Sequence, residues 1–197
     1  MLSSMRSTAL LVIMGACTST SQGGVDAEAC RTPQPIAVPD RFTFTPEAED
    51  PFRLNQGPDA SVTSSTTRGR CGPLDVKKED LGGVPSFSIT TLFCSWGTVE
   101  TRTLTQVPEG APVSLRLWHF SHIKIGKAEA QIEMRVDGRT LWQTTVPLPT
   151  DGALITADFG APFPIAEGAR LLWHVSNHGQ NSWNFLSLDK LEVPCPD

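Results

Sequence analysis

The chain has 197 residues, a formal net charge of −5 and five cysteines. This length suits one domain of ordinary size with a hydrophobic core. The mildly acidic balance and the lack of a basic cluster argue against nucleic acid as a partner.

The first seventeen residues follow the order of a bacterial signal peptide. Arg6 lies in a weakly basic start, residues 9–14 form a short apolar run, and small residues precede Cys17. The run is shorter than the roughly 20 apolar residues that a membrane-spanning helix needs. Its end resembles a lipobox, with Met14 where leucine is usual, which implies cleavage before Cys17 and acylation of that cysteine. An ordinary secretory signal, cut at or near Ala16, is the alternative.

We therefore expect a signal peptide over residues 1–16, a lipidated flexible tether over 17–40 and a folded domain over 41–197. The tether is predicted because its sequence is rich in Ser, Thr, Gly and Pro. Several acyl chains on Cys17 would anchor the protein stably to a membrane. The expected location is the bacterial cell envelope, outside the inner membrane. The outer membrane is preferred because Thr18, rather than an aspartate, follows the cysteine.

The four cysteines after Cys17 form an even set, as expected of an exported protein with disulfides. They contain no CxxC pair and no zinc-finger spacing, so a structural zinc site is not expected. Three pairings are possible. We favour Cys71–Cys94, which would link two neighbouring strands, and Cys30–Cys195, which would tie the ends of the domain together.

The body of the chain has the periodicity of β-structure. Short strands separated by Pro and Gly are predicted over residues 87–93, 98–104, 113–120, 128–136, 140–146, 154–159, 169–176 and 182–193. The clearest is 128–136, where apolar and polar residues alternate strictly. Asp137-Gly138 follows it and predicts a two-residue hairpin turn. With no convincing amphipathic helix, the expected fold class is all-β, a two-sheet antiparallel sandwich or a barrel.

Five segments stand in a particular order: VSLRL at 113–117, IEMRVDG at 132–138, VP at 146–147, IAEGARLL at 165–172 and WNFLSLDKLEV at 183–193. This order resembles that of galactose-binding-like jelly rolls, especially the carbohydrate-binding modules that share the fold, over about residues 44–193. The resemblance implies a jelly-roll sandwich. It places ligands either in loops at one end of the sandwich or on a concave sheet face.

The loop between the last two predicted strands is the candidate sugar site, because such modules often place a sugar-binding asparagine there. Amides and imidazoles can pair with hydroxyl groups while an indole offers a flat apolar face. The candidate ligand-binding residues are Asn177, His178, Gln180, Asn181 and Trp183. This hypothesis predicts that Trp183 is exposed to solvent. In the alternative, Asn177 only helps to form the turn and Trp183 belongs to the core.

The same resemblance implies a structural calcium ion near the N-terminal strand. Glu47, Glu49 and Asp189 are the candidate ligands, since calcium takes several oxygen ligands from separate segments. A solvated acidic turn is the alternative for the two glutamates. No other cofactor is expected.

All four histidines lie in two Trp-His segments, 117–122 and 172–178. His122, His174 and His178 could together bind a transition metal. Strand geometry weakens this hypothesis, because His119 and His122 are three residues apart and would point to opposite faces of a strand. The two segments are also expected in opposing sheets. In the alternative, the Trp-His pairs pack at the ends of the sandwich.

The sequence has no GxSxG elbow, no HExxH motif and no phosphate-binding glycine loop, so we expect no catalysis. Three hypotheses remain. The first is a membrane-anchored, extracytoplasmic carbohydrate-binding lipoprotein. The second is an envelope lipoprotein that binds a protein partner, which predicts a buried Trp183 and an apolar surface patch elsewhere. The third is the histidine-based metal-binding protein.

Overall fold

The computed structural model describes residues 33–45, 70–122, 128–177 and 182–191. The elements in these ranges are β1 (Gln34–Ala37), η1 (Pro39–Arg41), β2 (Thr43–Phe44), η2 (Pro73–Asp75), β3 (Val76–Asp80), β4 (Pro85–Thr90), β5 (Trp96–Arg102), β6 (Pro112–His119), β7 (Ala128–Val136), β8 (Arg139–Leu148), β9 (Ala153–Gly160), β10 (Arg170–Ser176) and β11 (Ser182–Lys190). Both η elements are 3₁₀ turns. Within the described ranges, no helix is long and apolar enough to span a bilayer.

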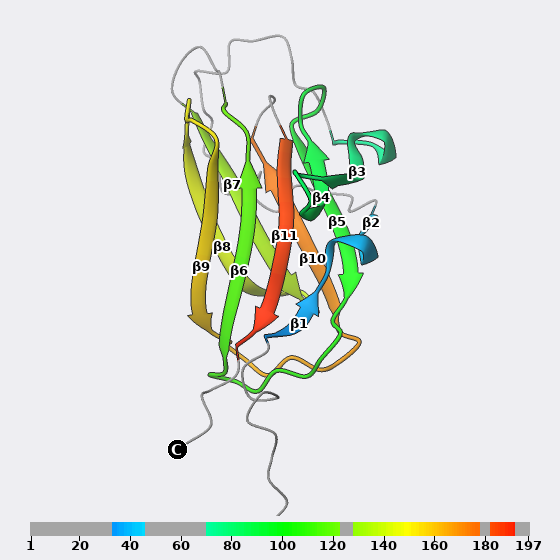
Figure 1. Ribbon diagram of the computed structural model, residues 1–197, viewed down its shortest axis with the longest axis vertical. Helices are drawn as coiled ribbons and strands as arrows, with labels where there is room; N and C mark the ends of the chain where they lie inside the picture. Colours follow the sequence, from blue (N-terminus) through cyan, green and yellow to red (C-terminus); the bar gives the residue numbers. More distant parts are fainter. Residues whose placement is uncertain (1–32, 46–69, 123–127, 178–181, 192–197) are drawn as a thin grey trace, which may run out of the picture.

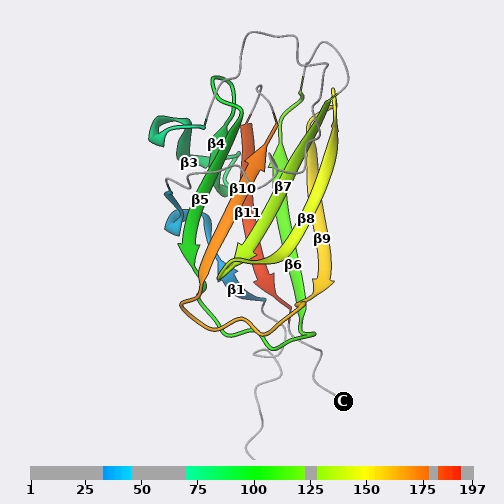
Figure 2. The same cartoon turned by 180° about the vertical axis from the view of Figure 1, so that it is seen from behind.

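Two antiparallel sheets pack face to face (Figures 1 and 2). The six-stranded sheet, in front in Figure 1, has the order β3-β4-β11-β6-β9, with β1 also paired to β11. The five-stranded sheet, in front in Figure 2, has the order β2-β5-β10-β7-β8. The predicted all-β class and the two-sheet antiparallel sandwich are confirmed.

Aromatic side chains from both sheets meet in the core. The ring of Phe42, between η1 and β2, lies 4.7 Å from that of Phe185 on β11 and 6.3 Å from that of Trp173 on β10. All three are buried. Because side chains alternate between the two faces of a strand, the neighbours of Trp173 and Phe185 along the chain point away from this core.

The eight predicted strands are all present, with ends that differ from the prediction by a few residues. The predicted turn between β7 and β8 is confirmed by the positive φ angles of Asp137 (48°) and Gly138 (82°). Asp137 also fixes the start of β10, because its Oδ1 accepts a hydrogen bond from the backbone N of Arg170 at 2.9 Å.

Three strands were not predicted. β1 lies inside the predicted tether, yet it pairs with residues 188–190 of β11 and buries Ile36 and Ala37. The ordered domain therefore begins before residue 41, and the assignment of Gln34–Ala37 to a flexible tether is wrong. The remaining two are β2, of only two residues, and β3, whose sequence VKKED has no apolar alternation and forms an edge of its sheet.

The predicted disulfide between Cys71 and Cys94 is present. It joins the segment before η2 to the connection between β4 and β5, rather than two strands as expected. The backbone N of Cys71 donates to the carbonyl of Trp96 at 2.7 Å, so the first cysteine is also held by β5. The predicted partners Cys30 and Cys195 lie outside the described residues.

Candidate functional site

The predicted sugar-binding loop is only partly described. His178, Gln180 and Asn181 lie outside the described residues, whereas Asn177 and Trp183 lie within them. Asn177 is buried, and its backbone N donates to the carbonyl of Ser95 at 3.0 Å. Trp183 is 0% exposed, so the expectation of a solvent-exposed indole is wrong.

Trp183 is buried because it points into the sandwich from β11. It stands two residues before the core residue Phe185, on the same face of the strand. Its ring lies 4.9 Å from that of His119 and 4.6 Å from that of His122. The indole therefore packs against protein groups and is not offered to a ligand.

The two histidines of the first Trp-His segment stack on each other, with ring centroids 5.2 Å apart. The expectation that they point to opposite faces of a strand is wrong because β6 ends at His119. His122 lies beyond the strand, in an isolated bridge to Thr150, so the two-residue alternation no longer applies to it.

His174 lies in the other sheet, as predicted. Its Nδ1 is 2.7 Å from the Oγ1 of Thr98, and its ring lies 5.7 Å from that of Trp96. It alternates with the core residue Trp173, so it faces outward from the five-stranded sheet while His122 packs on Trp183. The structure does not bring these two members of the predicted metal site into one environment, and His178 lies outside the described residues.

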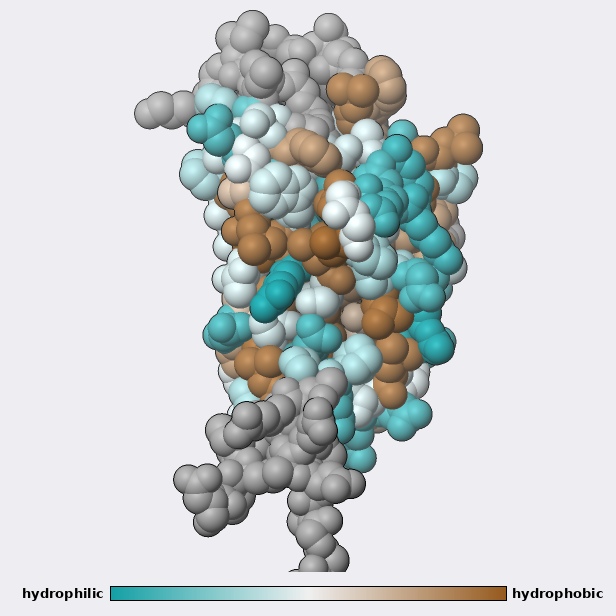
Figure 3. Space-filling model, viewed as in Figure 1, coloured by the Kyte–Doolittle hydropathy of each residue, from teal (hydrophilic) through white to brown (hydrophobic). Residues whose placement is uncertain are grey.

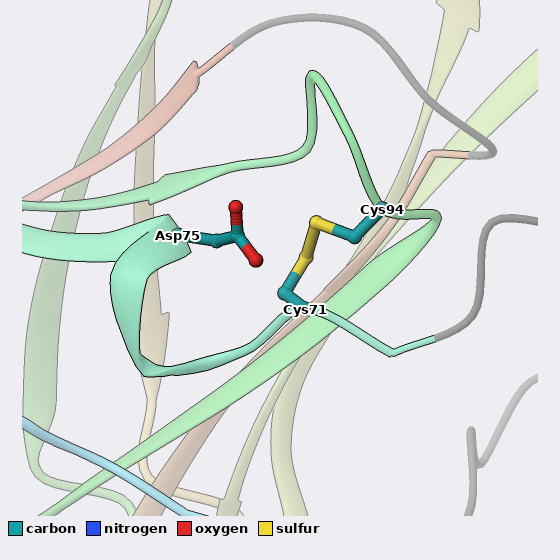
Figure 4. A group of neighbouring side chains, drawn as sticks. All are labelled: Cys71, Asp75 and Cys94. Carbon is teal, nitrogen blue, oxygen red and sulfur yellow. A yellow bond between two sulfur atoms is a disulfide. The ribbon is translucent and has the colours of Figure 1, made fainter.

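The predicted calcium ligands are not brought together in the described part of the chain. Glu47 and Glu49 lie outside it, and Asp189 sits within β11, in register with Ser114 and Pro35. Figure 4 shows a different group of ligand-type side chains, formed by Cys71, Asp75 and Cys94. It is a disulfide beside a carboxylate that accepts a hydrogen bond from the backbone N of Gly72 at 2.7 Å, which accounts for all three side chains without a metal.

The outward surface of the six-stranded sheet, here called the front face, is the surface seen in Figure 3. It is a mosaic of apolar and polar patches. One row crosses all five strands of the sheet order, because strand register aligns Lys77 (β3), Ser88 (β4), Asn184 (β11), Trp118 (β6) and Leu154 (β9). These residues alternate with core residues on their own strands and therefore share the outward side.

An apolar platform occupies one end of this row. The ring of Trp118 meets that of Phe120 edge-on, with centroids 6.3 Å apart and planes at 90°. Phe120 is 41% exposed and Leu154 is 51% exposed. Trp118 itself is half-buried. A flat indole flanked by exposed apolar groups can pack against the apolar face of a sugar ring.

Uncharged polar groups lie beside the platform. Asn184 and Ser88 follow Trp118 in the row, and the hydroxyls of Thr90 and Ser182 lie 3.0 Å apart in the neighbouring row. The nearest charges on this face are at its margins, where Lys77 pairs with Glu79 at 2.6 Å, and at Arg116, two residues before Trp118. The middle of the row therefore carries no charged side chain, and its two polar residues, Ser88 and Asn184, are both 0% exposed beneath this surface.

The outer face of the five-stranded sheet is different. The buried carboxylate of Glu133 on β7 accepts a hydrogen bond from Thr140, on the edge strand β8, at 2.6 Å. It also pairs with the half-buried Arg135 at 2.8 Å. Together with the Thr98–His174 contact, these bonds form a polar network rather than an open binding surface.

Large apolar side chains are exposed near the disulfide. Leu74 on η2 is 96% exposed and Phe93, next to Cys94, is 71% exposed. Figure 1 shows η2 and the β4–β5 connection towards the end of the sandwich away from β1. This group, which we call the apolar tip, is held covalently by the Cys71–Cys94 bond.

No protein-family model matches the chain. No curated protein matches it either.

Among solved structures, a carbohydrate-binding module of family 27 that recognises mannan matches with a TM-score of 0.43 and 6% identity, over 62% of this chain and 82% of that module. A family 28 module specific for non-crystalline cellulose matches with a TM-score of 0.41 and 9% identity, over 60% of this chain and 80% of its own length. A family 6 module from Clostridium stercorarium, in complex with cellobiose, matches with a TM-score of 0.39 and 12% identity. The match covers 62% of this chain and 86% of that module. Carbohydrate-binding modules recur among such matches, but similarity of this degree does not define a family, and the fold rests on the strand order described above.

Proposed function

We propose that this protein is a non-catalytic glycan-binding lipoprotein of the bacterial cell envelope, which holds a neutral sugar chain on its front face. The observation that carries the proposal is the row that places Trp118 between exposed Leu154 and the carboxamide of Asn184. A sugar ring needs both kinds of group, a flat apolar surface for its carbon face and polar partners for its hydroxyls.

This site replaces the loop site predicted from the sequence. Trp183 is buried against two histidines, and Trp118 takes the role of the stacking indole. The front face corresponds to the second of the two ligand positions expected for a jelly roll, a sheet face rather than an end loop.

The location rests on separate observations. The sequence MGAC at 14–17 supports acylation of Cys17, and an acylated cysteine would hold the protein outside the inner membrane. The Cys71–Cys94 disulfide agrees with an oxidising compartment. The outer membrane is our preferred site of anchoring.

A glycan-binding screen followed by titration calorimetry tests the proposal on the whole mature protein in detergent. We expect a neutral polysaccharide or oligosaccharide to bind, and Trp118→Ala to abolish binding without unfolding the protein. Trp96→Ala is the matched control, because it removes a half-buried indole from the opposite sheet. Binding that survives Trp118→Ala, or that is lost equally in Trp96→Ala, would contradict the front-face site.

A second function is favoured by a specific observation. The protein-partner hypothesis predicts a buried Trp183 together with an apolar patch elsewhere, and the structure has both, in the burial of Trp183 and the exposure of Leu74 and Phe93. Rigid, exposed apolar side chains are typical of protein-binding surfaces.

Cross-linking in intact envelopes tests this second candidate. A partner that binds the apolar tip should be captured by the natural protein and lost from Leu74→Ser/Phe93→Ser. Val84→Ser is the matched control, because Val84 is also exposed but precedes β4, at the strand end opposite Phe93. A partner that the double variant still captures would exclude the tip as its binding surface.

A further inference from the structure

The middle of the front face holds polar atoms without partners. Within the described part of the chain, neither Oδ1 nor Nδ2 of Asn184 has a hydrogen-bond partner, and the Oγ of Ser88 has none. Both residues are 0% exposed. They are direct cross-strand neighbours on β11 and β4. Three unpaired polar atoms therefore lie at two neighbouring positions of the row.

Such a position lowers the stability of a fold. A buried carboxamide loses its hydrogen bonds to water and gains none in return, whereas an apolar side chain of the same size would lose nothing. The indole N–H groups of Trp173 and Trp183 are also unpaired, but these side chains face the core between the sheets. Asn184 and Ser88 face outward, beside the proposed stacking surface of Trp118.

We propose that Asn184 and Ser88 receive the acetamido group of an N-acetylhexosamine residue in the bound glycan. This inference rests on the proposed function of the front face and names its ligand class. An acetamido group carries one N–H donor and one carbonyl acceptor in a plane. These two groups point in opposite directions, because the amide is trans, so the carbonyl accepts from Nδ2 of Asn184 and from the Ser88 hydroxyl. Oδ1 of Asn184 then accepts from the neighbouring hydroxyl on carbon 3 of the sugar.

Two further features favour an acetamido group over a pair of ring hydroxyls. The atoms of Asn184 lie below the surface, and an acetamido group projects further from a sugar ring than a hydroxyl does. Its methyl group also needs an apolar neighbour, which Trp118 supplies from the adjacent strand. Because Asn184 and Ser88 are 0% exposed, binding requires that the side chains above them rearrange.

Two tetrasaccharides provide the test, because chitotetraose and cellotetraose share a β-1,4-linked glucose backbone and differ in the acetamido or hydroxyl group at carbon 2. Calorimetric titration of the whole mature protein should show chitotetraose binding roughly 30-fold more tightly, the value expected for two added hydrogen bonds. Asn184→Leu should remove this preference while raising the melting temperature. Asn184→Ala provides a second variant if the leucine is not accommodated, and Thr156→Ala, at another row of the front face, should leave the preference unchanged.

Each contrary result has a distinct meaning. Equal affinity for the two tetrasaccharides would overturn the acetamido assignment and leave glycan binding on the front face in place. A preference that persists in both Asn184 variants would also overturn it. If no sugar binds and Trp118→Ala changes nothing, the proposed function itself fails, together with this inference.

Discussion

The imidazole of His122 stacks on the indole of Trp183, with ring centroids 4.6 Å apart and planes at 29°. The two residues come from a segment after β6 and from β11, and both are buried. His119 joins them at the end of β6, so two imidazoles and one indole pack together at this end of the six-stranded sheet. The stack explains why a tryptophan beside a predicted ligand loop is a structural residue.

Replacement of Trp183 should therefore act on stability first. We expect Trp183→Ala to lower the free energy of unfolding by about 3–5 kcal/mol, because a large buried side chain is removed and a cavity remains beside the two imidazoles. Urea denaturation followed by circular dichroism measures this loss. Trp118→Ala should cost much less, since that indole is half-buried. Unchanged stability of Trp183→Ala, with loss of sugar binding, would return the indole to the binding site.

The disulfide gives a second stability prediction. Cys71 and Cys94 are 23 residues apart in sequence, and a closed loop of this size contributes about 3 kcal/mol in the chain-entropy model. We expect Cys71→Ala/Cys94→Ala to lower the free energy of unfolding by about that amount. A double variant as stable as the oxidised protein would mean that the bond contributes nothing to folding.

The strands that alternate apolar and polar residues could be predicted from the sequence, because this alternation is what places one face of a sheet in the core. β1 could not, since Pro33 and Pro35 read as breakers and only the pairing with residues 188–190 shows that Ile36 is a core residue. β3 could not be predicted either, because its sequence, with Lys77 and Lys78, carries the charges of an edge strand and has no buried face of its own.

The front face could not be predicted for a different reason. Its row joins five strands, and residues as distant as Ser88 and Asn184 become neighbours only through strand order and register. The sequence does show that Trp118 alternates with the apolar residues Leu117 and Leu115 on its strand. The same two-residue alternation puts Trp183 on the same face of its strand as Phe185, and so would have placed Trp183 in the core. What the sequence lacks is any sign of which outward-facing residues meet.

The buried carboxylate of Glu133 leads to a third prediction. It accepts a hydrogen bond from Thr140 at 2.6 Å and pairs with Arg135 at 2.8 Å, and it is 2% exposed. We expect Glu133→Gln to lower the free energy of unfolding by about 1–3 kcal/mol, because Arg135 loses its charged partner. Glu129→Gln is the matched control on the same strand, since Glu129 is exposed. Equal effects of the two variants in urea denaturation would show that the Glu133 ion pair is not a stabilising contact.

Gly97 gives the last prediction, at the point where β5 passes the disulfide. A Cβ atom added there would lie 2.9 Å from Cγ2 of Ile89, a core atom, and 3.2 Å from Cβ of Cys71. Neither neighbour is free to move, because Ile89 is fully buried and Cys71 is bonded to Cys94. We expect Gly97→Ala to lower the free energy of unfolding by about 1–3 kcal/mol through overpacking. Gly72→Ala is the control, since its added Cβ would meet only Asp75, at an ordinary contact distance of 3.7 Å. Thermal unfolding of both variants should give a lower melting temperature for Gly97→Ala than for Gly72→Ala. Equal melting temperatures would mean that β5 and the disulfide are not packed as closely as described.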